Sequence, residues 1–169
     1  GTVLRMGAIY GARVKGNYRR LLESLARGRF MPIGQGHNRR TLIYDRDAAR
    51  AVVLALQHPA VSGRVFNVTD CKVHTLNQVI AAMCRALQRN PPRWAIPVTP
   101  VHVAAGVMDG AFRLLGLKAP VMAATVNKYV EDGAGDGQRF QREMGFEPLY
   151  DLEAGWREAV ADMKRTGVL

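Results

Sequence analysis

The chain has 169 residues, 48% of them hydrophobic, which is enough for one hydrophobic core, and no apolar stretch approaches the roughly 18 residues of a transmembrane helix. The formal net charge is +10, but Lys and Arg are scattered singly or in pairs without a basic run. We therefore expect a folded protein that binds neither nucleic acid nor a membrane.

The sequence given opens with a β-prone apolar segment, Thr2-Val3-Leu4, and glycines follow at Gly7 and Gly11. Because the segment is apolar on both sides, it predicts a strand that is covered on both faces of a parallel sheet. Such a strand needs neighbours before or after it in the chain. We therefore interpret the sequence as starting inside a domain, and we expect exposed apolar area and self-association.

A helix is predicted to start near Asn17, a good cap residue, and to end at Gly28, which suits a left-handed C-terminal position. The segment from Phe30 to Ile33 is predicted to be extended. Its Pro32 restricts it to an edge or to an irregular connection, because proline donates no backbone hydrogen bond.

A second short strand is predicted over Thr41 to Tyr44, and Asp45 or Asp47 is expected to cap a helix that ends near Gln57. Small side chains would let this helix lie close to a sheet. Its predicted buried face consists of Ala48, Val52, Ala55 and Leu56.

Arg64 to Val68 predicts the next buried strand, and Thr75 with Gln78 forms a capping box for the helix that follows. A further helix is expected to start at Thr99 with Pro100 at its first position. Its predicted buried face consists of Val101, Ala104, Ala105, Met108, Phe112 and Leu115, and Gly116 is expected to end it.

The Gly-rich segment from Asp132 to Gly137 predicts a surface loop without regular structure, before a short helix through Phe140 and Met144. Asp151 is expected to cap the last helix. The buried side of that helix is predicted to be Leu152, Trp156, Ala159, Val160 and Met163. The chain is thus predicted to be α/β, with short strands and about six helices.

Side chains that carry chemistry are sparse. The two cysteines, Cys71 and Cys84, and the four histidines have no metal-ligand spacing, so we expect reduced cysteines and no metal site. The two serines lie outside any nucleophile-elbow pattern. The chain starts without a charged and apolar leader, and a cytoplasmic location is expected.

Five motifs stand in one order along the chain: Leu4-Arg5 through Tyr10-Gly11, Gly34-x-Gly36-x-Asn38-Arg39-Arg40, Tyr44-x-x-Asp47-x-Ala49, Phe66-Asn67-Val68-Thr69-Asp70 and Met144-Gly145-Phe146-x-Pro148. Together they resemble the C-terminal half of extended short-chain dehydrogenase/reductases. Among these, the chain is most similar to the NAD-dependent epimerase/dehydratase family of the UDP-glucose 4-epimerase type. The resemblance implies a partial Rossmann-like fold, with residues 1–169 forming the C-terminal substrate-binding portion.

Two motifs of that family are missing from this sequence. The Gly-rich dinucleotide fingerprint is not found, and no Tyr is followed four residues later by Lys. In the family both precede the region that this chain resembles. We therefore expect NAD to be bound by a full-length parent but not by this chain alone, and we assign no catalytic residue in this sequence.

The resemblance also implies ligand contacts. The residues on the cofactor side are Gly7, Ile9 and Tyr10, and those on the nucleotide-sugar side are Asn17, Phe30, Ile33 and Arg40. Arg40 takes the place of a diphosphate-binding arginine, since a guanidinium can hold two phosphate oxygens at once. The simpler interpretation of Arg40 is a solvated turn residue beside Arg39.

Two alternatives remain open. The motifs are shared with 3β-hydroxysteroid-dehydrogenase-like oxidoreductases, and Arg5 with Gly7 to Gly11 suits that branch equally well. In the second alternative, the chain is a non-catalytic binding domain that has kept the second half of the fold. Binding of UDP-sugars rather than sterols would separate the first alternative from the epimerase hypothesis.

Overall fold

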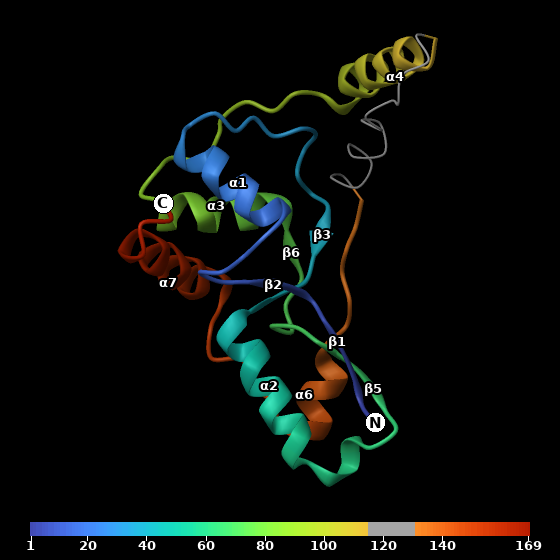
Figure 1. Cartoon of the computed structure of the whole chain (residues 1–169), viewed down its shortest axis with the longest axis vertical. Coiled ribbons are helices and arrows are strands. Elements are labelled where there is room, and N and C mark those ends of the chain that lie inside the picture. The colour runs from blue at the N-terminus through green and yellow to red at the C-terminus, as the bar shows by residue number, and fades with distance from the viewer. Residues whose placement is uncertain (115–130) are drawn as a thin grey trace.

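The computed structural model describes residues 1–114 and 131–169, and its architecture confirms the predicted α/β class. The helices of this part of the chain are α1 (Asn17–Ala26), α2 (Asp45–Gln57), α3 (Leu76–Ala86), α4 (Val98–Leu114), α6 (Gln138–Met144) and α7 (Leu152–Arg165), with a 3-10 helix over Pro59–Val61. The strands are β1 (Val3–Met6), β2 (Ala8–Tyr10), β3 (Arg39–Arg40), β4 (Leu42–Tyr44), β5 (Val65–Val68) and β6 (His74–Thr75). The molecule is elongated, with α2 and α6 at one end, α1, α3 and α7 in the middle and α4 at the other end (Figure 1).

The first two strands continue one another but pair with different partners. β1 runs parallel to β5, with Val3 opposite Val65, and β2 runs parallel to β4. Gly7 lies at the switch, where its amide donates to the carbonyl of Val68 and the next amide, that of Ala8, donates to the carbonyl of Thr41. A single extended segment therefore joins both parallel pairs.

The larger core lies between α1, α3, α7 and the β2–β4 pair. Tyr10 and Trp156 stack there with ring centroids 4.6 Å apart, and both side chains are fully buried. The predicted buried side of α7 is confirmed, and Asp151 caps this helix by accepting a hydrogen bond from the amide of Ala154. The capping box of Thr75 and Gln78 at the start of α3 is confirmed as well.

A smaller core lies between α2, α6 and β5. Phe140 packs between Phe66 and Phe146, with ring centroids 5.6 Å and 5.4 Å away. The short helix α6, predicted through Phe140 and Met144, buries both of these side chains. The two cores together fix the parallel strands β4 and β5 in place.

The predicted caps of α1 and α2 are wrong. The cap of α1 is Gly16, with φ 71°, so Asn17 is already the first helical residue. The cap of α2 is Tyr44 and no side chain caps that helix end. Asp47 instead accepts hydrogen bonds from the amides of Leu149 and Tyr150, because this later segment brings its donors to the carboxylate.

Two predicted buried surfaces are also only partly correct. On α2 the small residues Ala48 and Ala55 are buried, but Val52 is exposed and Leu56 is 82% exposed, because only the small side chains fit against the strands. On β1, Val3 is 52% exposed, so the strand is not covered on both faces in this structure. The only strand that pairs with β1 among the described residues is β5.

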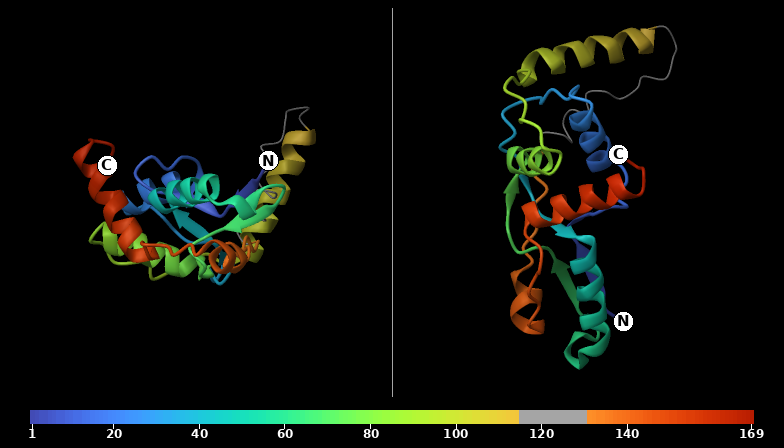
Figure 2. Two further views of the ribbon diagram at one scale, coloured as in Figure 1. Left: turned by 90° about the horizontal axis from the view of Figure 1, so that it is seen from below. Right: turned by 90° about the vertical axis from the view of Figure 1, so that its left-hand side faces the viewer.

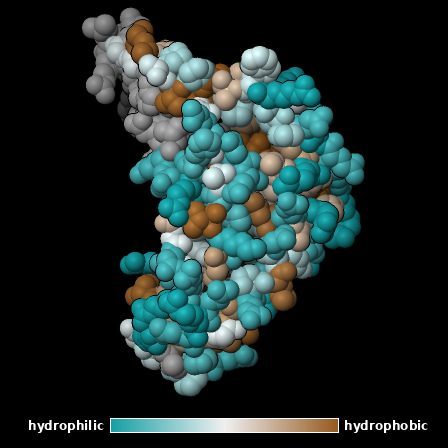
Figure 3. All heavy atoms as spheres, turned by 180° about the vertical axis from the view of Figure 1, so that it is seen from behind, coloured by the Kyte–Doolittle hydropathy of each residue, from teal (hydrophilic) through white to brown (hydrophobic). Residues whose placement is uncertain are grey.

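Helix α4 begins at Val98, so Pro100 is its third residue rather than its first. It lies apart from the other helices (Figure 2), and Ala105 is the buried member of its predicted face while Ala104 and Met108 are exposed. The side chain of Phe112 and the residues 115 and 116 lie outside what is described. Seen from behind, the molecule is mostly hydrophilic with separate hydrophobic patches, one of them at the α4 end (Figure 3). No helix in the described ranges is long and apolar enough to cross a membrane.

Candidate functional site

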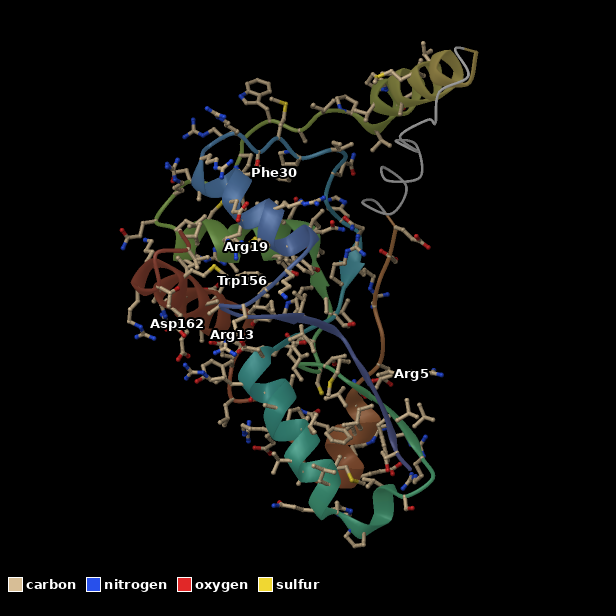
Figure 4. The ribbon with its side chains drawn as sticks, viewed as in Figure 1. Arg5, Arg13, Arg19, Phe30, Trp156 and Asp162 are labelled. Atoms are coloured by element: carbon tan, nitrogen blue, oxygen red, sulfur yellow. The ribbon has the colours of Figure 1, made fainter. Side chains whose placement is uncertain are left out.

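A cleft of about 1010 Å³ opens where the two parallel strand pairs, α1 and the segment after residue 130 meet. This volume is at the upper end of the range for small-molecule sites. Its lining includes four of the residues expected from the sequence, namely Gly7, Asn17, Phe30 and Arg40. Phe30 lies beside α1 (Figure 4).

The other three expected residues do not line this cleft. Ile33 forms an isolated parallel bridge with Ile96. Ile9 is 48% exposed, on a different part of the surface. Tyr10 is turned into the core, where its hydroxyl donates to the carbonyl of Asp151 at 3.3 Å. Burial raises the pKa of Tyr10, and the nearby Asp70 raises it further, so this phenol stays protonated.

Arg40 is held from both sides by backbone pairing. On one side β3 pairs antiparallel with β6, with Arg40 opposite His74. On the other side Arg40 forms a parallel bridge with Gly133. The alternation of the extended segment leaves Arg40 half-buried in the cleft and Arg39 exposed outside its lining.

The segment from residue 132 to 135 is exposed and has no regular structure, as its glycines predicted, but an isolated bridge at Gly133 ties it to β3. The amide of Gly133 donates to the carbonyl of Arg39 at 2.8 Å, and the amide of Thr41 donates to the carbonyl of Gly133 at 3.2 Å. A carboxylate oxygen of Asp132 accepts from the amide of Arg39 at 2.6 Å, and Thr41 Oγ1 accepts from the amide of Gly135 at 3.0 Å. The segment thus lies against β3 through this single bridge and forms one wall of the cleft.

A buried contact between two polar side chains supports β6. His74 Nε2 lies 2.5 Å from a carboxylate oxygen of Asp70, and both side chains are buried. The second oxygen of Asp70 accepts from the amide of Lys72 at 3.2 Å. These contacts fix β6, and through it the backbone of Arg40.

The cleft is positively charged. Arg5 and Arg20 line it together with Arg40, and Asp132, the acidic residue of the lining, is engaged with the backbone of Arg39. Tyr18 also lines it; burial raises its pKa, and the positive charge of Arg40 opposes this shift. Arg5 and Arg20 were not expected from the sequence as ligand contacts, because no local sequence pattern indicates a ligand residue at either position. The fold shows them as candidates, since it places both in the lining of this cleft.

Gly7 leaves the chain no room for a side chain. A Cβ atom built on it would lie 3.0 Å from the carbonyl oxygen of Thr41 and 3.3 Å from Thr69 Cγ2. Two neighbouring backbones therefore meet at the floor of the cleft. This is a structural reason for glycine at the position, independent of any cofactor contact.

The residues present do not fit a complete dinucleotide site. Within the described parts of the chain, the glycines of the cleft wall follow no strand-to-helix turn with the dinucleotide fingerprint, so they offer no amide cradle for a pyrophosphate of NAD. The described residues also contain no group of three or more His, Cys, Asp or Glu side chains that could hold a metal ion.

The strand order, the helices and the cleft define the class of this protein: an α/β chain with a partial Rossmann-like fold. Residues 1–69 match the model of the NAD dependent epimerase/dehydratase family, and the chain resembles a partial member of that family. A relative from Escherichia coli O157:H7, N-acetyl-alpha-D-glucosaminyl-diphospho-ditrans,octacis-undecaprenol 4-epimerase, is 26% identical over 154 residues, covering 91% of this chain and 46% of the relative.

Solved structures show the same fold. The UDP-glucuronic acid 4-epimerase of Bacillus cereus, in complex with UDP-glucuronic acid and NAD, matches with a TM-score of 0.67 at 16% identity, over 98% of this chain and 45% of that chain. The UDP-glucose 4-epimerase of Thermotoga maritima, with UDP-glucose, matches with a TM-score of 0.65 at 20% identity, over 98% and 46%. The chain thus spans about half the length of the relatives that it matches.

Proposed function

We propose that this chain is the substrate-binding portion of an NAD-dependent nucleotide-sugar epimerase or dehydratase, and that its cleft holds the substrate's diphosphate and base. The observation that carries the proposal is the meeting of Asn17, Phe30 and Arg40, which are distant in sequence, in one basic cleft. The guanidinium of Arg40 would bind adjacent phosphate oxygens, and the ring of Phe30 would lie along the base.

The charge of the cleft favours this function over the steroid-dehydrogenase-like alternative. Arg5, Arg20 and Arg40 line the cleft, and an apolar alcohol offers no anionic group that their guanidinium groups could bind. A sugar diphosphate offers them phosphate oxygens. The substrate named for the E. coli relative, a diphospho-undecaprenol, also carries a diphosphate, so a test should address the diphosphate first.

The test measures UDP binding by isothermal titration calorimetry on the 169-residue chain, with uridine as the comparison that lacks phosphate. Arg40→Ala should weaken UDP binding about ten- to a hundredfold, the loss of a charge-assisted bidentate pair, and leave uridine binding unchanged. Arg40→Lys should lose less. Arg39→Ala is the matched control and should have almost no effect; equal losses for the two alanine variants would contradict the proposal.

NAD chemistry belongs, in this proposal, to the full-length protein. Proton abstraction and hydride transfer need groups that this sequence lacks, so the purified chain should turn over no nucleotide sugar with NAD. Detection of such turnover would refute the proposal. A dinucleotide fingerprint and a Tyr-x-x-x-Lys pair encoded upstream of Gly1 would separate a divided enzyme from a non-catalytic binding domain.

We also propose that the isolated chain self-associates through the edge of β1. Val3 and Val65 are both largely exposed on the β1–β5 pair, and unpaired strand edges readily accept another strand. Light scattering should report a mass above that of the monomer at tens of micromolar. Val3→Lys should restore the monomer, because a charged side chain at an edge opposes pairing. A monomeric parent chain at that concentration would contradict the proposal.

A further inference from the structure

Gly133, in the wall of the cleft, lies next to the side chain of Arg40. A Cβ atom built on Gly133 would lie 2.8 Å from Arg40 Nη1, and also 3.8 Å from Cδ and 3.9 Å from Cζ. The first distance is shorter than a van der Waals contact allows. The guanidinium of Arg40 therefore occupies the space that a side chain at position 133 would take.

The backbone at this point cannot move away easily. Gly133 exchanges two hydrogen bonds with the strand of Arg40, and the neighbouring Asp132 accepts a third from the amide of Arg39. The end of an arginine side chain, in contrast, rotates at low cost. A side chain at position 133 would therefore displace the guanidinium rather than the strand.

We propose that Gly133 is the positioning residue for Arg40: by carrying no side chain, it lets the guanidinium lie along the cleft wall in the place where it meets a phosphate group. The proposal rests on the proposed function, because it assumes a ligand with a diphosphate. It adds a determinant of diphosphate affinity that itself makes no side-chain contact with the ligand.

Gly133→Ala tests this without a backbone penalty, since Gly133 is not among the glycines with positive φ. Gly135→Ala is the matched control from the same segment, where the nearest atom to an added Cβ is Thr41 Oγ1 at 3.9 Å, an ordinary contact. Gly133→Ala should weaken UDP binding about tenfold and leave uridine binding unchanged, whereas Gly135→Ala should change neither. In an Arg40→Ala background, Gly133→Ala should cause no further loss.

A readout without ligand completes the test. The Nε–Hε NMR resonance of Arg40 in the chain alone should shift in Gly133→Ala and stay in place in Gly135→Ala; an unchanged resonance in Gly133→Ala overturns the inference. Equal effects of both glycine variants, or a loss of UDP affinity that persists without Arg40, also overturn it. UDP binding that is insensitive to Arg40→Ala overturns the proposed function together with this inference, while sensitivity to Arg40→Ala alone overturns only the inference.

Discussion

Gly155 in helix α7 is the position where a single methyl group should disturb the larger core. A Cβ atom built there would lie 2.3 Å from the hydroxyl oxygen of Tyr10 and 2.9 Å from two atoms of its ring. The ring cannot retreat, because Tyr10 stacks on Trp156 and packs against Tyr44 with a centroid distance of 5.5 Å. Gly155→Ala should therefore destabilise the fold.

The magnitude follows from three contributions. Alanine favours a helix interior over glycine by about 1 kcal/mol. Overpacking a rigid core costs about 1–3 kcal/mol, and loss of the hydrogen bond from the Tyr10 hydroxyl to the carbonyl of Asp151 costs about 1 kcal/mol. The net expectation is a decrease of about 1–3 kcal/mol in the free energy of unfolding.

The assay is urea denaturation followed by circular dichroism. Gly155→Ala should lower the midpoint with an unchanged slope, which identifies a loss of stability. Gly106→Ala in α4 is the matched control, since nothing lies within 4 Å of its added Cβ, and it should be neutral or stabilising. Combining Gly155→Ala with Tyr10→Phe should cost less than the sum of the two changes. A stable Gly155→Ala, or equal destabilisation by the control, would refute the reasoning.

Three other contacts give predictions that can be measured. Asp47→Ala should lower the free energy of unfolding by about 2–4 kcal/mol, because it leaves two backbone amides without their acceptor; urea denaturation measures this loss, and a change below about 0.5 kcal/mol would contradict it. Burial raises the pKa of Tyr10 in the folded chain, so above pH about 10 the unfolded chain releases this proton while the folded chain keeps it. The free energy of unfolding should therefore be unaffected by this group below that pH and decrease above it. Thermal midpoints measured against pH should show this decrease, and it should be shallower in Tyr10→Phe. Gly36→Ala should destabilise by about 1–3 kcal/mol in the same urea assay, because φ is 63° and an added Cβ would lie 2.0 Å from the side-chain oxygen of Asn77, whereas an unchanged midpoint would show that the turn adjusts freely.

Local signals in the sequence were sufficient for much of the secondary structure. The capping box at Thr75 and the cap at Asp151 depend only on residues three positions away, and both were predicted correctly. The pairing of Gly133 with Arg40 was missed because its glycines indicate a loop and its hydrogen bonds join distant parts of the chain, as the bond between Arg39 and Asp132 does across 93 positions. The cap at Asp47 was wrong for the same reason, since its partners lie 102 and 103 residues further along the chain.

The candidate site divides in the same way. A family resemblance selected Asn17, Phe30 and Arg40, which the fold brings into one cleft. Arg5 and Arg20 required the structure, because a lone arginine on a strand or a helix carries no local pattern. Arg5 and Arg20 come close to Arg40 only through the tertiary packing of the chain.

The position of α7 bears on how this protein folds during synthesis. The hydroxyl of Tyr10 meets a carbonyl that is 141 residues later, and the Trp156 ring that stacks on Tyr10 is later still. On the ribosome, the 141 residues that separate Tyr10 from Asp151 must be synthesised before these partners exist, so part of the apolar face of the β2–β4 pair stays open until α7 is released. Such non-local contacts slow folding and prolong the exposure of sticky surface. The yield of folded protein should therefore depend on chaperones that hold this face, more than its equilibrium stability alone would suggest.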